Sequence, residues 1–329
     1  MQPKIHHKTV KNRHSLLKSL EKCGKIRRGN LTLPTSNQTM GDMTMRYQFL
    51  RFPGGKPKAL TFSYDDGCPQ DLRLSDVLTA HGMKGTFNFN SDACRGSAAL
   101  PREQVEAYFL NRGHEIAVHG SLHRAEGAQR PIEGIQDVLS CRLELEKRYN
   151  RIIRGMAYPD SGIRRMTNGA TYENIKGYLS DLDIAYARTL GTDNDKFELP
   201  ADWHAWMPSA HHKNPDILKY ADAFAAINMA TTYYHAIRYP RLFYIWGHAY
   251  EFDQDNNWDL IETICEKLEN KDDIWYATNI EIYDYVWAYQ SLQYSADSTV
   301  IYNPTAQTVW FERDAKPYCI APGETLHLA

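Results

Sequence analysis

The chain has 329 residues, of which 43% are hydrophobic and 24% charged, enough for one large α/β domain with additions or for two medium domains. Its net charge of −2 argues against nucleic-acid binding as the main function. The six cysteines form no Cys-x-x-Cys pair, which excludes a zinc knuckle and a dense disulfide framework. No apolar run of about 18 residues could span a membrane, and the N-terminus lacks a secretory core. We expect a cytoplasmic protein, or an extracytoplasmic one if a leader has been removed.

Residues 1–46 differ from the rest of the chain because their lysines and arginines far outnumber their two acids, Glu21 and Asp42. We expect a basic N-terminal extension and linker, with a short helix over residues 15–22. Such an arm could contact an anionic surface, but we favour a solvated or packed extension.

From residue 47 to 291, apolar strands alternate with segments of helical periodicity. The expected strands are 60–67, 85–90, 114–118, 152–158, 184–188 and 242–246; the expected helices are 74–81, 102–112, 132–149, 174–182, 217–233 and 259–268. This alternation predicts parallel βαβ units and a closed or nearly closed β/α barrel. Residues 292–329 read as short strands with turns, and we expect a small C-terminal β extension packed on the barrel rather than a binding module.

The first of these strands ends in Asp65-Asp66-Gly67. Two adjacent carboxylates destabilise each other unless they share a cation or a proton. Because successive side chains of a strand point opposite ways, Asp65 and Asp66 could serve two separate tasks. Asp-Asp-Gly is also good turn chemistry, so a turn and a site are both open from this stretch alone.

Three further strands end in polar candidates: His119 with His123, Tyr158-Pro159-Asp160, and His248. In β/α barrels the carboxyl ends of the strands carry the active site, so these side chains should converge with the two aspartates. Two histidines spaced His-x-x-x-His, together with one carboxylate, are a common open metal site. The sequence therefore favours His119 and His123 as metal ligands.

A loop-rich stretch with Trp206, His211 and His212 should lie over the barrel mouth. It has two interpretations: a substrate-binding rim with an aromatic platform, or ordinary loop packing with surface histidines.

Phe62-Ser63-Tyr64-Asp65-Asp66-Gly67 resembles the Thr-Phe-Asp-Asp-Gly motif of the NodB-type polysaccharide deacetylases. The segment His119 to His123 resembles their His-x-x-x-His metal motif. Tyr158-Pro159-Asp160-Ser161-Gly162 is similar to their Arg-Pro-Pro-Tyr-Gly loop, and the strand before His248 is similar to the one that carries their catalytic histidine. The resemblance covers about residues 60–289.

The resemblance implies a deformed (β/α)7 barrel that holds one divalent metal ion, usually zinc, with cobalt, nickel, manganese or iron as alternatives. By position, Asp66, His119 and His123 would be the metal ligands, Asp65 the catalytic base and His248 the general acid. Tyr158, Asp160, Trp206 and His211 are further candidates for contacts with the substrate or the oxyanion. The implied partner is an acetylated sugar or oligosaccharide.

The chain departs from the family pattern at three places. Gly120 stands where the family usually has Ser or Thr, and Ala157 stands where its arginine would steady the catalytic Asp. Another cation or donor should therefore reach the Asp65 carboxylate, and Arg154 is the first candidate because it is the nearest arginine in sequence. The Asp-Trp motif that partners the acid histidine has no clean match; the candidates are Asp202, Glu251 and Asp253.

Three functions remain open from the sequence. The leading one is a metal-dependent deacetylase that removes N- or O-linked acetyl groups from a carbohydrate. The others are an amidase for a small non-sugar substrate and a catalytically silent barrel that binds carbohydrate or metal. Asp65 beside three intact ligands argues against the silent barrel, because a binding module has no use for a base next to its metal.

Overall fold

The computed structural model describes residues 47–91, 100–229 and 238–328. These residues fall in one of two units that separate by their contacts, Arg46–Ala329, while the other unit is Met1–Met45. The predicted basic arm and its helix over residues 15–22 lie outside the described residues. The predicted domain boundaries at 46/47 and 291/292 stay predictions.

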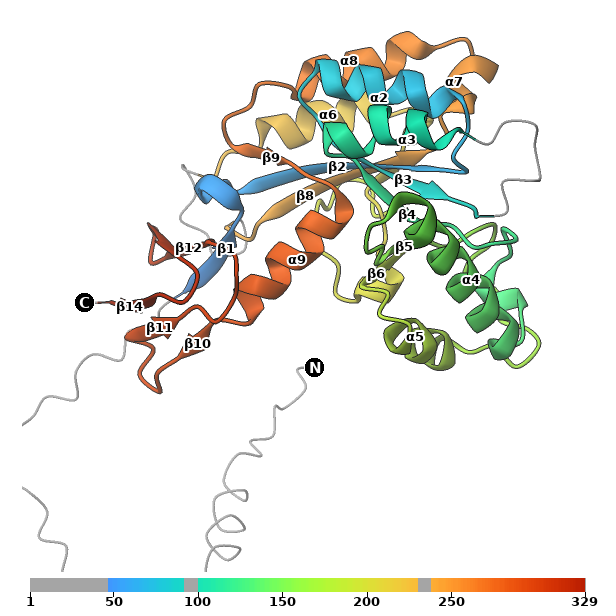
Figure 1. Cartoon of the computed structure of the whole chain (residues 1–329). Helices are drawn as coiled ribbons and strands as arrows, with labels where there is room; N and C mark the ends of the chain where they lie inside the picture. The colour runs from blue at the N-terminus through green and yellow to red at the C-terminus, as the bar shows by residue number, and fades with distance from the viewer. Residues whose placement is uncertain (1–46, 92–99, 230–237, 329) are drawn as a thin grey trace, which may run out of the picture. The chain divides into compact units, whose positions relative to one another are not determined.

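A curled parallel sheet forms the centre of the molecule (Figure 1). Its order is β6-β5-β4-β3-β2-β8-β7, and β9 also pairs with β2. The strands are β2 (Lys58–Asp65), β3 (Gly85–Phe89), β4 (Glu115–Val118), β5 (Gly155–Ala157), β6 (Tyr186–Arg188), β7 (Ala210–His211), β8 (Arg241–Gly247) and β9 (Ile274–Tyr276). A parallel bridge between Arg188 and Trp206 brings β6 close to the segment before β7 and nearly closes the sheet. The predicted deformed barrel is confirmed.

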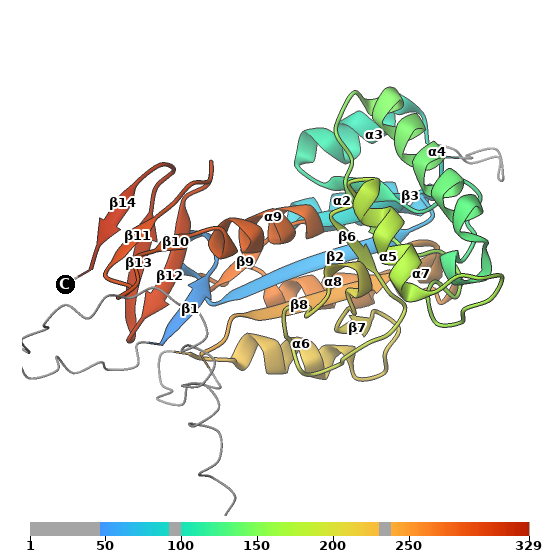
Figure 2. The same ribbon diagram turned by 90° about the horizontal axis from the view of Figure 1, so that it is seen from below.

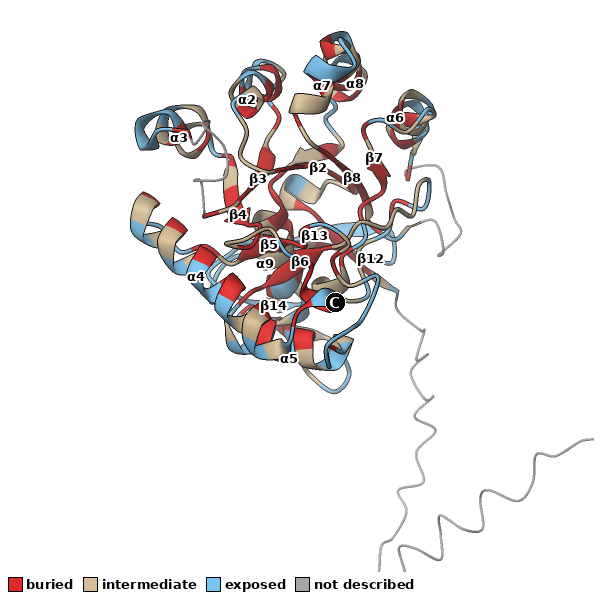
Figure 3. Cartoon of the chain, turned by 90° about the vertical axis from the view of Figure 1, so that its right-hand side faces the viewer, coloured by how far each residue is buried: buried red, intermediate tan, exposed pale blue. Residues whose placement is uncertain are grey.

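Helices surround the sheet, as Figure 3 shows for α2 to α8. They are α2 (Gln70–Ala80), α3 (Arg102–Tyr108), α4 (Pro131–Tyr149), α5 (Tyr172–Asp181), α6 (Ile217–Ala226), α7 (Tyr250–Gln254), α8 (Trp258–Leu268) and α9 (Asn279–Gln290). The helix predicted over 217–233 was too long, because α6 ends at Ala226 and Ile227 is extended. No helix among the described residues is long and apolar enough to cross a membrane.

Strand β8 separates the two sides of the sheet, because its side chains alternate. Phe243 and Ile245 join the core cluster that contains the buried residues of the outer helices, whereas Tyr244 and Trp246 join a second cluster with Trp206. A continuous apolar strand buried on both faces is typical of parallel sheets. The core therefore has an outer layer under the helices and an inner layer within the curl.

The C-terminal residues form two small antiparallel sheets beside α9 (Figure 2). One contains β1 (Gln48–Arg51), β12 (Val309–Arg313) and β13 (Lys316–Ile320); the other contains β10 (Gln293–Tyr294), β11 (Val300–Tyr302) and β14 (Thr325–His327). The Tyr285 hydroxyl on α9 donates to the Arg51 carbonyl at 2.8 Å and accepts from the Trp310 N–H at 2.8 Å. The extension is thus bonded to the barrel and to the first described strand.

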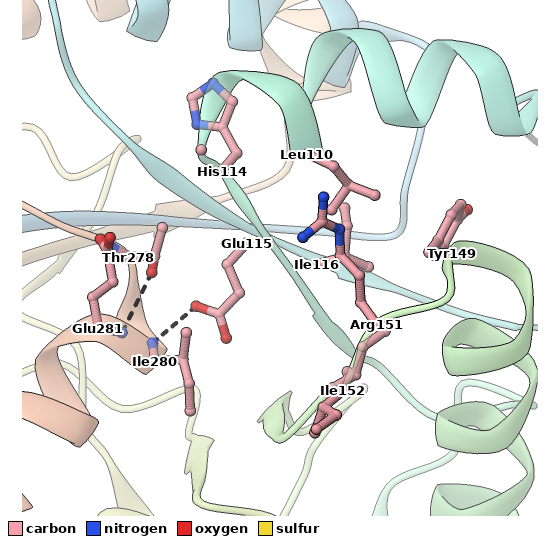
Figure 4. A pocket seen from close by; sticks show the side chains of 12 residues that line it. Leu110, His114, Glu115, Ile116, Tyr149, Arg151, Ile152, Thr278, Ile280 and Glu281 are labelled. Carbon is pink, nitrogen blue, oxygen red and sulfur yellow. Dashed lines mark hydrogen bonds between the residues drawn. The ribbon is translucent and has the colours of Figure 1, made fainter. Parts of the chain in front are cut away.

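At the amino edge of the sheet, Glu115 of β4 joins three elements (Figure 4). Its carboxylate accepts hydrogen bonds from the Tyr186 hydroxyl at 2.8 Å, the Thr86 hydroxyl at 2.8 Å and the Ile280 N–H at 2.9 Å. Ile280 lies in the first turn of α9, where the N–H groups have no partner inside the helix. Glu115 therefore supplies a partner for the start of α9 from the sheet.

Candidate metal centre and active site

The two aspartates lie where β2 ends, and the backbone turns between them. Asp65 is the last residue of the strand and is 2% exposed, whereas Asp66 follows with φ of +80° and Gly67 with φ of +63°. A non-glycine residue with positive φ is strained, and such strain concentrates at functional sites. The turn directs the two carboxylates to different neighbours.

Asp66 meets both predicted histidines. Its Oδ1 atom lies 3.5 Å from Nε2 of His119 and 3.3 Å from Nε2 of His123. These separations exceed ordinary hydrogen bonds, yet they match the roughly 3.3 Å between two ligands of a tetrahedral ion bound at about 2.0–2.1 Å. Burial raises the pKa of Asp66, but its contacts with the two histidines outweigh burial and hold that pKa well below its ordinary value.

The tautomer of His119 suits a metal ligand. Its Nδ1 lies 2.9 Å from the Ala157 carbonyl, which can only accept, so Nδ1 carries the proton. Nε2 is then left with a lone pair, and this buried atom has no hydrogen-bond partner among the described residues. A carbonyl behind a histidine is the usual outer-shell support of a metal ligand. The three donors therefore fit a divalent ion.

The loop between the histidines is braced from α4. Gly120 has φ of +72°, and a Cβ there would lie 2.6 Å from Oδ2 of Asp137. Oδ1 of the same carboxylate accepts the Leu122 N–H at 2.8 Å. Asp137 thus fixes this loop in a chain that lacks a hydroxyl at position 120.

Asp65 is held by an arginine that the sequence analysis did not single out. Nη2 of Arg188, at the end of β6, lies 2.5 Å from Oδ2 of Asp65, and the Asn88 amide donates to Oδ1 at 2.8 Å. Arg188 is fully buried and its guanidinium stacks 4.4 Å from the Trp246 ring. The expectation for Arg154 was wrong: it pairs with Asp284 at 2.7 Å, at the amino edge of the sheet. The sequence did contain a signal for this contact, because the predicted strand 184–188 ends in Arg188, at the edge of the sheet where the other site residues were expected.

His248 approaches the two aspartates from another strand than His119 and His123 do. Its Nε2 is 4.0 Å from Oδ2 of Asp65 and 4.0 Å from Oδ2 of Asp66. Its Nδ1 lies 3.4 Å from Oε2 of Glu251, which also accepts the His248 backbone N–H at 3.1 Å. Burial lowers the pKa of His248, but the contact with Glu251 and the nearby aspartates outweigh burial and raise it.

Of the three candidate partners for His248, the structure brings only Glu251 to it. Asp202 pairs with Lys176 at 2.7 Å, and Asp253 accepts from Nε1 of Trp258 at 2.7 Å. Glu251 lies on α7, three residues after His248, so the turn into that helix places carboxylate and imidazole together.

A second group of potential ligands consists of His211, His212 and Glu251. Oε2 of Glu251 lies 3.3 Å from Nε2 of His211 and 3.5 Å from Nε2 of His212. However, the Lys213 N–H donates to Nδ1 of His211 at 3.1 Å, so the proton of a neutral ring sits on Nε2 and points at the carboxylate. His211 is therefore a hydrogen-bond donor here, and the group fits a metal ion less well than the His119 group does.

Two of the predicted substrate contacts are corrected by the structure. Trp206 is only 1% exposed and packs against Tyr186, Trp203 and Tyr244, so it closes the barrel and forms no rim. Tyr158 is buried, its hydroxyl donates to the His204 carbonyl and its N–H to the Arg188 carbonyl, so neither group is free for an oxyanion. Asp160 is exposed, and its charge contributes to raising the pKa of His123.

Residues 46–175, which contain Asp65, Asp66, His119 and His123, match the polysaccharide deacetylase family. No curated protein matches the chain.

Solved structures with similar folds include relatives of this family. The chain resembles Puue allantoinase at a TM-score of 0.50 and 13% identity, over 71% of this chain and 91% of that one. A protein of Mycobacterium smegmatis that is inferred to be a polysaccharide deacetylase gives 0.49 and 16%, over 73% and 94%. A family 4 acetyl xylan esterase from Clostridium thermocellum, in complex with a cobalt ion, gives 0.41 and 15%, over 69% and 90%. At these identities the allantoinase match supports the fold alone.

Relative to the deacetylase pattern, the three departures each have a local counterpart here. Asp137 braces the loop at Gly120, Arg188 contacts Asp65 in place of an arginine at Ala157, and Glu251 contacts His248. At the three positions where this chain departs from the family pattern, polar contacts thus come from residues elsewhere in the fold.

Proposed function

We propose that the protein is a metal-dependent hydrolase that removes N- or O-linked acetyl groups from a carbohydrate. The observation that carries this proposal is the convergence of two separate sets at one sheet edge. Asp66, His119 and His123 form a set with free ligand atoms, and Asp65 and His248 flank it. The match of residues 46–175 to the polysaccharide deacetylase family supports a carbohydrate substrate.

Asp66, His119 and His123 would hold the ion, zinc being the first candidate for two histidines and a carboxylate. A bound ion of this kind acidifies water and polarises a carbonyl. Asp65 takes the proton from the attacking water, and its pairing with Arg188 keeps it oriented. We do not assign Asp65 as a metal ligand, because its Oδ2 lies 3.9 Å from Nε2 of His119, whereas Oδ1 of Asp66 lies 3.5 Å from the same nitrogen.

His248 donates a proton to the departing amine or alkoxide from Nε2, the nitrogen that faces the aspartates. Glu251 holds Nδ1 and stabilises the charged ring, as a carboxylate partner does in other acid–base histidines. His211, whose Nε2 also faces Glu251, would orient that carboxylate rather than contact the substrate.

The test is Asp65→Asn, compared with wild type and with Asp253→Asn as a control carboxylate on α7. Asp65→Asn should keep its metal content and its melting temperature while turnover falls about 10² to 10⁴-fold, the effect typical of losing a general base. Metal content is measured by elemental analysis, and turnover as acetate release from N-acetylglucosamine oligomers and acetylated xylan oligomers, with and without chelator. Asp253→Asn should match wild type.

Full activity of Asp65→Asn would show that Asp65 is not the base. A wild-type protein that carries metal but releases no acetate from either substrate would favour the silent barrel. Hydrolysis of a small amide alone would instead favour the amidase. His119→Ala should lose the ion and stay folded, because the core does not depend on the metal.

A further inference from the structure

A second hollow lies at the edge of the sheet opposite the metal centre. It has a volume of about 590 Å³ and is formed by Arg154 before β5, Asp183 before β6, one face of α9, and the turn at residues 304–307 of the C-terminal extension. Because β5 and β6 run from this edge toward Tyr158 and Arg188, the hollow and the metal centre lie at opposite ends of the same strands. We refer to it as the α9 groove.

Trp287 forms the apolar floor of the α9 groove and is 57% exposed. All seven tryptophans of the sequence lie in the described residues, and the other six are buried or half-buried. The indole of Trp287 makes no ring contact with any described residue, although Tyr283, one turn earlier on α9, is half-buried against Trp203. A single exposed ring is ordinary on a protein surface, but the polar groups around this ring point to a binding role.

Groups that accept and donate hydrogen bonds flank the ring. Asp183 is 77% exposed, and its nearest charged partner is Nη2 of Arg142 at 3.8 Å, so its carboxylate remains largely free. Gln307, which is also exposed, lines the same groove. Arg154, a further lining residue, is fixed by Asp284 at 2.7 Å, which holds a planar guanidinium in the wall.

This combination matches the surface of a sugar. The ring C–H face of a pyranose is apolar and can cover an indole, while its outward hydroxyls pair with carboxylates, amides and guanidinium groups. A phosphate chain would meet two carboxylates with a single arginine, which disfavours nucleic acid. A flat apolar partner would leave the carboxylates unpaired.

We propose that the α9 groove is a glycan-binding site, with Trp287 as its platform and Asp183 and Gln307 as hydrogen-bonding partners. The choice of a carbohydrate rests on the proposed function, because a deacetylase of polymers meets long glycan chains. A chain held at the amino edge leaves the metal centre free, so the groove anchors the protein on the polymer. The C-terminal extension then has a binding role, because residues 304–307 form one wall.

Another cavity, shown in Figure 4, lacks this character. Its volume is about 250 Å³, and its two lining carboxylates are already engaged, because Glu115 accepts three hydrogen bonds and Glu281 pairs with Lys84. Its aromatic lining residues, His114 and Tyr149, are buried, so it offers a sugar no platform like Trp287.

The proposal is tested by titrating two probes, the N-acetylglucosamine hexamer and soluble acetylated xylan, into the full chain by calorimetry. The Asp65→Asn background prevents turnover of the probes. Trp287→Ala should weaken binding of at least one probe about tenfold or more, whereas Tyr302→Ala, which removes an exposed aromatic outside the groove, should leave it unchanged. Asp183→Asn should weaken it less. In the active protein, Trp287→Ala should keep wild-type turnover of a short substrate, acetylated xylobiose.

Equal affinities of Trp287→Ala and its parent for both probes would overturn the proposal, as would a parent that binds neither probe. The two proposals fail separately. Trp287-dependent glycan binding without acetate release would leave the groove standing and remove the proposed activity. Acetate release together with a glycan affinity that does not depend on Trp287 would support the proposed activity and remove the groove as a binding site.

Discussion

Arg188 and Asp65 form a charged pair that is almost entirely removed from water, with exposures of 0% and 2%. Such a pair adds little net stability, because desolvation offsets its attraction, but removing one member leaves an unpaired buried charge that costs about 3–5 kcal/mol. The pair therefore holds the Asp65 carboxylate in a fixed position beside the candidate metal ligands.

Arg188→Met should lower both turnover and the melting temperature, because Asp65 is left buried without its cation. We expect turnover to fall at least about 10²-fold, comparable to other losses of support at a catalytic group. Arg154→Met is the matched control, since Arg154 pairs with Asp284 near the surface and exposed pairs contribute about 0–1 kcal/mol. Acetate release from the short substrate acetylated xylobiose, whose turnover should not depend on the α9 groove, and thermal unfolding measure both effects. Loss of activity in Arg154→Met with retention in Arg188→Met would reverse the assignment.

At the level of residues, sequence patterns predicted the grouping of Asp66 with His119 and His123, because neighbouring parallel strands bring their carboxyl ends to one edge. They did not predict Arg188, because proximity along the chain pointed to Arg154, whereas the curl of the sheet decides which arginine reaches Asp65. Trp206 shows the same limit. A loop with aromatic residues can be interpreted as a substrate-binding rim. Only the bridge between β6 and the segment before β7 shows that the Trp206 ring is buried.

Among the elements, the contact of β4 with α9 makes stability depend on pH. Removal of the Glu115 carboxyl from water raises its pKa to about 7, although the hydrogen bonds from Ile280, Tyr186 and Thr86 oppose this. In the unfolded chain the same carboxyl titrates near its ordinary 4.5. Between these two values the folded state holds more protons than the unfolded state, so the free energy of unfolding falls as pH rises.

Glu115→Gln should remove this dependence. A glutamine oxygen can still accept the Ile280 N–H, and it has no charge to desolvate. The difference in unfolding free energy between Glu115→Gln and wild type should shift in favour of the variant by about 1–3 kcal/mol from pH 4.5 to 7. Urea unfolding at several pH values measures it.

The unfolding free energy of wild type is subtracted from that of the variant because the neighbouring His114 gives stability the opposite dependence on pH. Burial lowers the pKa of His114 to about 4, so the stability contributed by its neutral form is lost as pH falls from 6.5. Glu106→Gln, an exposed helical carboxylate paired with Arg102, is the control and should show a flat difference. A flat difference for Glu115→Gln would contradict the raised pKa.

The order of most elements between residues 60 and 268 could be predicted because helical and strand periodicities alternate clearly there, but the short elements β7 and α7, and β9 and α9 beyond residue 268, were not expected. The lengths of the expected elements could not be predicted, since β5 has three residues where seven were expected and α6 ends seven residues early. Pairing of β1 with β12 was not predictable either, because it joins segments at opposite ends of the barrel sequence and no local pattern specifies that register.

For the whole molecule, this pairing argues that the C-terminal extension is part of the fold. Deletion of residues 292–329 would leave β1 without β12 and expose Ala288 on α9, which packs in one apolar cluster with Phe311 and Ile320. We expect a clearly lower melting temperature and aggregation, measured by thermal unfolding with light scattering. Tyr285→Phe, which removes the hydroxyl between Arg51 and Trp310, should lower stability by about 1–3 kcal/mol without unfolding the chain. An unchanged melting temperature of the deletion variant would make the extension dispensable.

The Arg188–Asp65 pair also bears on how the chain reaches this state. The two residues are 123 positions apart, and their strands are separated in the sheet by β3, β4 and β5. Closing so long a loop is slow, because its entropy is lost before the contact is made. A partly folded chain in which β2, β3 and β4 have paired but β6 has not yet docked therefore keeps Asp65 hydrated and without its arginine. We therefore expect the pairing of Asp65 with Arg188 to form late in folding, so that a chain whose barrel is still open lacks this contact.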